Sequence, residues 1–262
     1  MPKFSVNLSM LFTERPFPER FQAAAEAGFS AVEFMFPYDY PAETCRAWLC
    51  GSNLKLALFN LPAGDFAGGE RGLAVLKERE SDFRQSVFTA LEYAEILEAP
   101  RMNCLTGLGA ADENDDGKFE RLTDRLGWAA DEFAKRGMTL LVEFINNYDM
   151  PAFYLNSLDR TVKLIKAVGR GNLKIQYDVY HAQRSGGELL SGMRTNLDLI
   201  GHVQIADNPG RHQPGTGEIN YPNVFKALDD MGYEGWVGLE YIPLGGSNES
   251  LAWIEQFSLS RK

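Results

Sequence analysis

Short apolar runs alternate along the chain with longer segments in which apolar residues recur at helical spacing. Apolar runs of about four to eight residues bounded by polar residues are typical of strands, whereas apolar residues at every third or fourth position are typical of amphipathic helices. The pattern predicts strands over residues 4–9, 31–36, 54–60, 101–107, 138–144, 173–178, 201–207 and 235–241. A helical pattern follows each of them, most clearly over residues 80–98, and an acidic loop over residues 111–117 is expected before the helix that follows the fourth strand. The chain therefore predicts eight strand–helix pairs in succession.

The even spacing of these pairs favours a closed barrel over an open sheet. Parallel strands joined by right-handed helical crossovers close on themselves when the unit repeats eight times in about 250 residues. The rival is a doubly wound open sheet, whose first strand is usually followed by a G-x-G-x-x-G turn. The sequence has LSMLFTERP there, and no Pro/Ser-rich linker divides the chain. We predict an α/β fold, a single (β/α)8 TIM barrel domain over residues 1–262.

Polar residues end four of the apolar runs at the same phase of the strand alternation. They are Glu143, Asp178, Gln204 and Glu240. Successive side chains of a strand point to opposite faces. If the apolar residues face the helices, these four face the barrel mouth at the C-terminal strand ends, where barrel enzymes place their catalytic groups. A solvated strand end is the ordinary explanation for any one of them, but the shared phase of all four favours a site.

Such a convergence of acids suggests a bound cation. Three carboxylates and an amide would repel one another if the acids were ionised and unpaired. Oxygen ligands suit Mg²⁺ or Mn²⁺, and His181 and His202 keep Zn²⁺ open as well. We therefore expect a divalent metal cofactor, Mg²⁺ or Mn²⁺, although the sequence leaves open whether it is required.

Side chains near other strand ends are candidates for substrate binding. Asn7 ends the first strand, and Glu70 and Arg71 lie in a Gly-rich loop after the third. His181, expected on the loop after the sixth strand, and Arg211, after the seventh, complete the set. A guanidinium can bind a substrate carboxylate with two hydrogen bonds. The alternative for each residue is an ordinary cap, loop contact or solvated charge.

The charge balance and the N-terminal sequence narrow the expected partners. The formal net charge of −10 argues against nucleic acid, because such binding needs a basic surface. MPKFSVNLSM has no signal-peptide pattern, and no run approaches the roughly 18 apolar residues of a membrane span. Three cysteines without metal-type spacing are expected to be reduced thiols. We expect a cytoplasmic protein with a small-molecule substrate and no membrane partner; a homo-oligomer stays open.

Segments spread over nearly the whole chain resemble the hydroxypyruvate isomerase family, within the xylose-isomerase-like TIM barrels. They are FSVNLSMLF, AVEFMFPYDY, FNLPAGDFAGGERG, LVEFINNYDMPAFYL, NLKIQYDVYHAQ, GHVQIADNPGRHQPGTGEINY and GWVGLEY. The 2-oxo-tetronate isomerases share much of this pattern. The resemblance implies two catalytic glutamates, Glu143 and Glu240, and a metal site at Glu143, Asp178, Gln204 and Glu240. It also implies a place in carbohydrate and glyoxylate metabolism.

The resemblance implies that the chain converts hydroxypyruvate to 2-hydroxy-3-oxopropanoate (tartronate semialdehyde) through an enediolate. A 2-oxo-tetronate isomerase and a ketose 3-epimerase on the same barrel are the nearest alternatives. A metal-dependent phosphodiesterase acting on DNA would want more histidines and a basic groove. A non-catalytic protein that binds sugar acids is the alternative outside enzymes.

Overall fold

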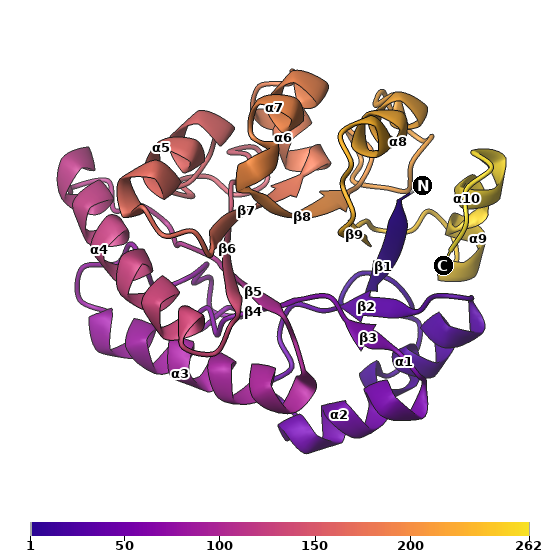
Figure 1. The fold of residues 1–262 in the computed structure, drawn as a ribbon, viewed down its shortest axis with the longest axis horizontal. Coiled ribbons are helices and arrows are strands. Elements are labelled where there is room, and N and C mark those ends of the chain that lie inside the picture. Colours follow the sequence, from indigo (N-terminus) through magenta and orange to yellow (C-terminus); the bar gives the residue numbers. More distant parts are fainter. Residues whose placement is uncertain (1, 262) are drawn as a thin grey trace.

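The strands form a ring with helices on its outside (Figure 1). The structure is a computed structural model that describes residues 2–261. Its sheet is parallel throughout, in the order β3-β2-β1-β9-β8-β7-β6-β5-β4. The strands are β1 Lys3–Asn7, β2 Ala31–Glu33, β3 Lys55–Leu56, β4 Phe59–Asn60, β5 Arg101–Cys104, β6 Thr139–Glu143, β7 Leu173–Asp178, β8 Ile200–Ile205 and β9 Trp236–Leu239.

The third expected strand is divided into two short pieces that close the ring. β3 pairs with β2, and β4 pairs with β5. The two pieces belong to one extended segment, so the covalent chain joins the two ends of the hydrogen-bonded sheet. Eight strand positions therefore surround the barrel, and the predicted (β/α)8 fold is confirmed.

Helices follow the strands at the places that the pattern predicts, with two differences. The helices are α1 Phe17–Glu26, α2 Ala42–Gly51, α3 Glu80–Leu97, α4 Asp115–Ala134, α5 Leu158–Val168, α6 Val179–Ser185, α7 Leu189–Thr195, the 3₁₀ helix η1 Leu197–Leu199, α8 Tyr221–Asp230, α9 Ser247–Ser250 and α10 Ala252–Gln256. None of those formed by residues 2–261 is long and apolar enough to cross a membrane.

Both differences come from side chains that cap helices. Residues 111–117 were expected to be a loop, but α4 begins within them because the Asn114 side chain accepts a hydrogen bond from the Gly117 N–H. The expectation that His181 lies on a loop was also wrong, again because a side chain caps a helix that begins earlier. The Asp178 side chain accepts from the Tyr180 N–H at 2.8 Å and starts α6, which carries His181.

The two faces of the strands differ sharply in chemistry. On the outer face, Phe4 of β1 packs against Phe225 of α8 and Trp253 of α10, with ring centroids 5.7 and 5.4 Å apart. The inner face is lined by buried polar side chains: Ser5, Asn7, Glu33, Asn60, Asn103, Glu143, Gln176, Asp178, His202 and Gln204. The barrel interior is therefore a polar chamber inside an apolar shell.

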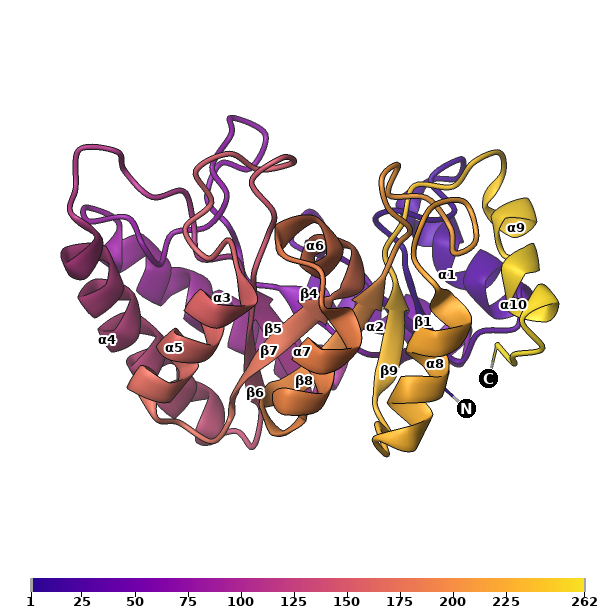
Figure 2. The same cartoon turned by 90° about the horizontal axis from the view of Figure 1, so that it is seen from above.

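Loops gather above the C-terminal ends of the strands, as Figure 2 shows for those that follow β4, β5 and β6. The register between β7 and β8 shifts by one residue near the N-terminal end of β8, since Ile175 pairs with Ile200 and Gln176 with His202. The extra residue is Gly201, where a Cβ would lie 2.7 Å from the Leu141 side chain. The bulge places Gln204 directly beside Asp178.

Candidate active site

Three carboxylates converge at the C-terminal mouth of the barrel. Glu143 ends β6, Asp178 ends β7 and Glu240 directly follows β9. Their exposed fractions are 4%, 0% and 6%, so they are buried rather than solvated strand ends. The alternation of the strands therefore predicted the direction of these side chains correctly.

Asp178 and Glu143 share a corner of the site with His181. His181 Nε2 lies 3.8 Å from Glu143 Oε1 and 3.7 Å from Asp178 Oδ2. Donor atoms of the three residues all lie within 4.8 Å of one another. Because Asp178 Oδ1 caps α6, its Oδ2 is the oxygen that faces this corner.

The hydrogen bonds around His181 determine which ring nitrogen carries the proton. Asn146 Oδ1 accepts from the backbone N–H groups of Tyr148 and Asp149, both at 3.0 Å. The Asn146 amide nitrogen therefore faces His181 Nδ1, at 2.7 Å, and Nδ1 is an acceptor. The neutral imidazole thus carries its proton on Nε2 and can donate it into the site.

Arg211 bridges two of the acids. Its Nη2 donates to Glu240 Oε2 at 2.8 Å and to Asp178 Oδ2 at 3.5 Å. Its backbone is in the left-handed region at φ 55°, and its guanidinium lies 5.3 Å from the Tyr180 ring centroid. Its buried Nε has no hydrogen-bond partner among residues 2–261.

The loop that carries Arg211 is organised by Asp207. The Asp207 carboxylate accepts backbone N–H groups of Gly215 at 2.8 Å, Gly217 at 2.9 Å and Ile219 at 3.1 Å. These bonds tie the far side of the loop to the end of β8. Such bonds help to hold a backbone conformation like that of Arg211, which a non-glycine residue seldom adopts.

Burial and mutual repulsion shift the acids from their ordinary titration. Burial raises the pKa of Glu240 to about 8 and that of Asp178 to about 6, while Arg211 opposes both shifts. Burial and the Glu240 and Asp178 carboxylates hold the pKa of Glu143 well above its usual range. Burial, then Arg211 and Arg184, hold the pKa of His181 well below its usual range. Extra positive charge in the site would lower the pKa of all three acids.

The donor atoms fit a divalent cation at the corner of Glu143 and Asp178. Glu143 Oε1 is buried and makes no hydrogen bond within the described part of the chain, and it faces the same space as Asp178 Oδ2. Two carboxylate oxygens at that spacing suit a hard cation. His181 would join them as a ligand only if its proton moved to Nδ1, which the facing Asn146 amide nitrogen opposes.

The other predicted ligand and binding residues have different surroundings. Gln204 lies beside Asp178, but its amide oxygen accepts from Gln176 Nε2 at 2.5 Å and its nitrogen donates to Glu33 at 2.7 Å. Asn7 Nδ2 donates to Glu240 Oε1 at 3.0 Å, so Asn7 supports a glutamate from below. Both residues therefore belong to the polar network beneath the three acids.

Glu70 and Arg71 are held within their own loop. Glu70 accepts from the Asp65 N–H at 2.6 Å and forms an ion pair with Arg79. Arg71 donates to the Phe66 and Glu70 carbonyls, both at 2.8 Å, and stacks on the Phe66 ring. Neither forms a hydrogen bond or ion pair with the three acids within residues 2–261. Their role in substrate binding stays a prediction.

Sequence reasoning missed the polar residues deeper in the barrel. Glu33, Gln176 and Asn103 are all buried. Asn103 and Gln176 donate hydrogen bonds to Glu143, and Glu33 accepts one from Gln204. The alternation that selected Asp178 also selects Gln176, two positions earlier. Applied to β2, it selects Glu33, because Val32 faces the helices. Asn146 gave no such signal, since it lies on a loop.

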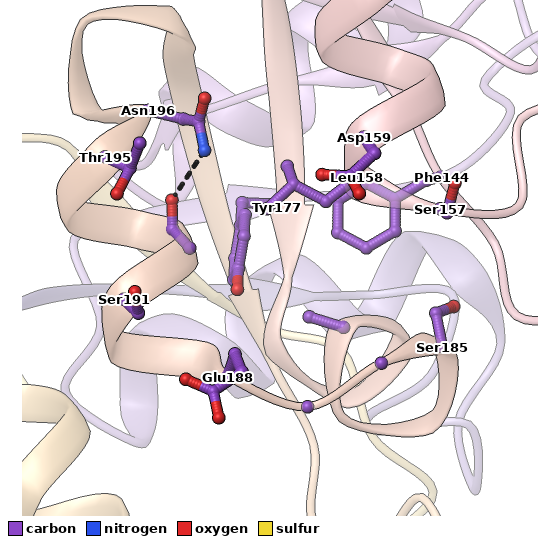
Figure 3. A pocket seen from close by; sticks show the side chains of 14 residues that line it. Phe144, Ser157, Leu158, Asp159, Tyr177, Ser185, Glu188, Ser191, Thr195 and Asn196 are labelled. Carbon is purple, nitrogen blue, oxygen red and sulfur yellow. Dashed lines mark hydrogen bonds between the residues drawn. The ribbon is translucent and has the colours of Figure 1, made fainter.

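The outer face of β7 carries a separate hollow of about 410 Å³ (Figure 3). Tyr177 forms its floor, between Ser157 and Leu158 at the start of α5 and Glu188 and Ser191 near α7. Tyr177 and Asp178 are adjacent in a strand and so point to opposite faces. This hollow is therefore not part of the carboxylate site.

Comparisons with known proteins agree with the fold. A family model described as a xylose isomerase-like TIM barrel matches residues 21–257. Hydroxypyruvate isomerase of Escherichia coli is 47% identical over 98% of this chain and 100% of its own. The 2-oxo-tetronate isomerase of Cupriavidus necator is 44% identical over 98% and 99%.

Solved structures extend the same relationship. AP endonuclease, family 2, from Brucella melitensis has a TM-score of 0.95 at 42% identity, covering 98% of this chain and 99% of that chain. At 22% identity, 3-keto-D-glucoside 4-epimerase from Escherichia coli has a TM-score of 0.82 over 97% and 100%, which shows the shared fold. The matched family model and the full-length relatives together establish that the chain belongs to the xylose isomerase-like TIM barrel family.

Proposed function

We propose that this protein is an isomerase of small 2-oxo and hydroxy acids that converts hydroxypyruvate to 2-hydroxy-3-oxopropanoate. The observation that carries the proposal is the arrangement of Glu143 and Glu240. Each is buried, each has one oxygen held from below by an amide, and each keeps a second oxygen at the mouth. In an isomerase that moves a proton between neighbouring carbons, one such group can take the proton from the first carbon and the other can deliver a proton to the second.

In the proposed reaction a proton leaves C3 of hydroxypyruvate and a proton is delivered to C2, through an enediolate. The hydroxyl at C3 becomes the aldehyde as the ketone at C2 becomes a hydroxyl, so no redox partner is needed. Burial raises the pKa of Glu240 to about 8 and that of Glu143 well above its usual range, so each carboxylate, once ionised, is a stronger base than an ordinary glutamate. Either glutamate could begin, with the other completing the transfer.

Arg211 and His181 are suited to hold the substrate between the glutamates. The free Nε–H of Arg211 can donate to the substrate carboxylate while Nη2 keeps its bond to Glu240. The Nε2–H of His181 can donate to a substrate oxygen that gains negative charge in the enediolate. Burial of the site excludes water from the intermediate.

A divalent cation is part of the proposal, with Mg²⁺ or Mn²⁺ the expected ions. Glu143 and Asp178 would hold it through Oε1 and Oδ2, and Glu240 and Gln204 stay predicted as further ligands. When bound, it would stabilise negative charge on the substrate oxygens. Proton transfer itself is assigned to the glutamates.

The 2-oxo-tetronates are the second candidate substrates, because a relative of that name is nearly as similar as the hydroxypyruvate isomerase. A DNA phosphodiesterase is disfavoured: the formal net charge is −10, and of the three histidines only His181 lies in the carboxylate cluster. We place the protein in the cytoplasm with a small-molecule substrate.

The decisive experiment follows both candidate substrates by NMR in D₂O, with and without a chelator. Turnover with deuterium incorporated at the carbon that is reprotonated supports the isomerase. Loss of turnover with chelator and recovery with Mn²⁺ or Mg²⁺ supports the cation. Binding of both acids without product or deuterium exchange would identify a binding protein and reject the proposal.

A further inference from the structure

Below the two glutamates lies a third glutamate that the proposed reaction does not use. Glu33, at the end of β2, is completely buried. Ser5 Oγ donates to its Oε2 at 2.8 Å, and His202 Nε2 lies 2.9 Å from the same oxygen. Its Oε1 accepts from Gln204 Nε2 at 2.7 Å and, more weakly, from Asn7 Nδ2 at 3.5 Å. Four polar groups from two strands, β1 and β8, thus meet on one carboxylate.

The barrel makes room for this carboxylate at Gly238. Gly238 lies on β9 between Ser5 of β1 and Gln204 of β8. A Cβ at this position would lie 2.5 Å from both Glu33 oxygens. The Glu33 side chain therefore reaches from β2 across β1 to the space beside β9 and β8. It can do so because Gly238 has no side chain there.

One arm of the network runs from Glu33 to Glu240. Asn7 Oδ1 accepts the Ser9 N–H at 2.9 Å, which turns the Asn7 amide nitrogen inward. That nitrogen then donates to Glu240 Oε1 at 3.0 Å as well as facing Glu33. The second oxygen of Glu240, Oε2, faces the barrel mouth and accepts from Arg211.

The other arm runs from Glu33 to Glu143 through two amides. Because Glu33 Oε1 accepts, Gln204 turns its nitrogen to Glu33 and its oxygen to Gln176. Gln176 must then turn its nitrogen to Gln204, at 2.5 Å, and the same nitrogen donates to Glu143 Oε2 at 3.1 Å. Glu143 Oε1 is left without a partner among the described residues and faces the mouth.

We propose that Glu33 is a positioning residue whose acceptor oxygen sets the direction of both arms and so aims the two catalytic glutamates. The inference rests on the proposed function, because it assigns reaction chemistry to Glu143 and Glu240. Side-chain amides have a donor end and an acceptor end, so one fixed acceptor orients the whole chain of amides. Reversal of the arm would put the Gln176 oxygen against Glu143 Oε2, and repulsion would move that carboxylate.

Two substitutions at Glu33 separate this role from a structural one. Glu33→Met keeps the length but removes both acceptor oxygens, and we expect kcat to fall at least tenfold, because displacements near 1 Å at reacting groups cost on the order of 10²-fold. Glu33→Gln keeps an oxygen for Gln204, while Ser5 can rotate and His202 can change tautomer to accept from its amide. We expect kcat within about threefold of wild type for Glu33→Gln.

Val32→Ala is the matched control, since Val32 is the adjacent residue on the outer face of β2. It should lower the melting temperature but leave kcat and KM of the folded enzyme unchanged. Unchanged kcat in folded Glu33→Met would overturn the proposal. An equal loss in Glu33→Gln and Glu33→Met would also overturn it, since the acceptor oxygen would then not be the determinant.

Gly238→Ala covers the case in which Glu33→Met does not fold. It displaces the Glu33 carboxylate without removing a polar group. We expect kcat to fall at least tenfold with KM changed less than threefold. If a crystal structure of the variant shows a displaced Glu33 side chain and the variant is fully active, the proposal is rejected.

Failure of the proposed function is recognised separately. If wild type turns over neither hydroxypyruvate nor a 2-oxo-tetronate, crystal structures of wild type and of the folded variant, Glu33→Met or Gly238→Ala, become the test. Reversed Gln204 and Gln176 amides with a displaced Glu143 carboxylate support the positioning role. Unchanged Glu143 and Glu240 positions overturn it, whatever the substrate.

Discussion

The two faces of β7 show how one strand serves two purposes. Ile175 and Tyr177 face the helices, where the Tyr177 hydroxyl donates to the Leu189 carbonyl and its ring packs edge-on against Phe144. Gln176 and Asp178 face the interior, where they bond to Glu143 and approach Arg211. All four are buried. Burial of apolar groups stabilises the fold, whereas burial of a carboxylate costs stability unless the group is paired or hydrogen-bonded.

This contrast predicts that substitutions on the two faces affect different measurements. Inner-face variants should change turnover more than stability, and outer-face variants should do the reverse. The predictions below run from the largest expected effect to the smallest.

Replacing either of the two glutamates proposed to be catalytic should have the largest effect. Glu143→Gln or Glu240→Gln should lower kcat for isomerisation by roughly 10²–10⁴-fold, because an amide cannot transfer the proton. The melting temperature should stay equal or rise, since a buried acid that repels its neighbours is neutralised. Steady-state kinetics and calorimetry check this, and near-wild-type turnover in either variant contradicts the assignment.

On the outer face, Ile175→Ala should destabilise the fold by about 2–5 kcal/mol, because it leaves a cavity between strand and helices. Turnover per folded molecule at low temperature should equal that of wild type. Denaturant unfolding and kinetics on the same sample measure both quantities. A loss of turnover as large as in Glu143→Gln would remove the distinction between the faces.

Replacing the arginine at the mouth should have a smaller, substrate-specific effect. Arg211→Lys keeps the charge but loses the fork that can serve Glu240 and a substrate carboxylate together. We expect KM for hydroxypyruvate to rise about tenfold, with the fold intact. A KM equal to that of wild type would place the substrate carboxylate elsewhere.

The raised pKa of Glu240 predicts how the stability of the metal-free protein depends on pH. Burial raises this pKa to about 8, so the folded state binds a proton that the unfolded state releases above its ordinary value of 4.5. Stability from this group is therefore present at low pH and is lost as pH rises toward 8. His181, whose pKa is lowered, acts in the opposite sense below its ordinary value of 6.5.

Between pH 6.5 and 8 the melting temperature in chelator should therefore fall, by a few degrees. Glu240→Gln should reduce this slope and leave the contribution of Glu143, whose pKa is also raised, while Ile175→Ala should lower the melting temperature at every pH without changing the slope. A rise of the melting temperature with pH over this window in wild type would contradict the assignment to Glu240.

Much of the site could be predicted because barrel strands obey a two-residue period. The phase that selected Glu143, Asp178 and Glu240 needs only the strand boundaries, and those follow from apolar runs. The same period could not assign roles. Gln204 has the phase of a ligand, and its role as one stays a prediction, but the register of β7 and β8 and the reach of Glu33 also give both ends of its amide partners that the period does not indicate.

The sequence by itself determined the order of eight strand–helix pairs, the face of each strand and the acids at the mouth, because all three depend on local periodicity. Only the tertiary structure decided which oxygen of each acid is free. That depends on contacts between residues far apart in the chain, such as Asn7 with Glu240 and Glu33 with Gln204. Such hydrogen bonds have no local signature, since their partners meet only when the barrel closes.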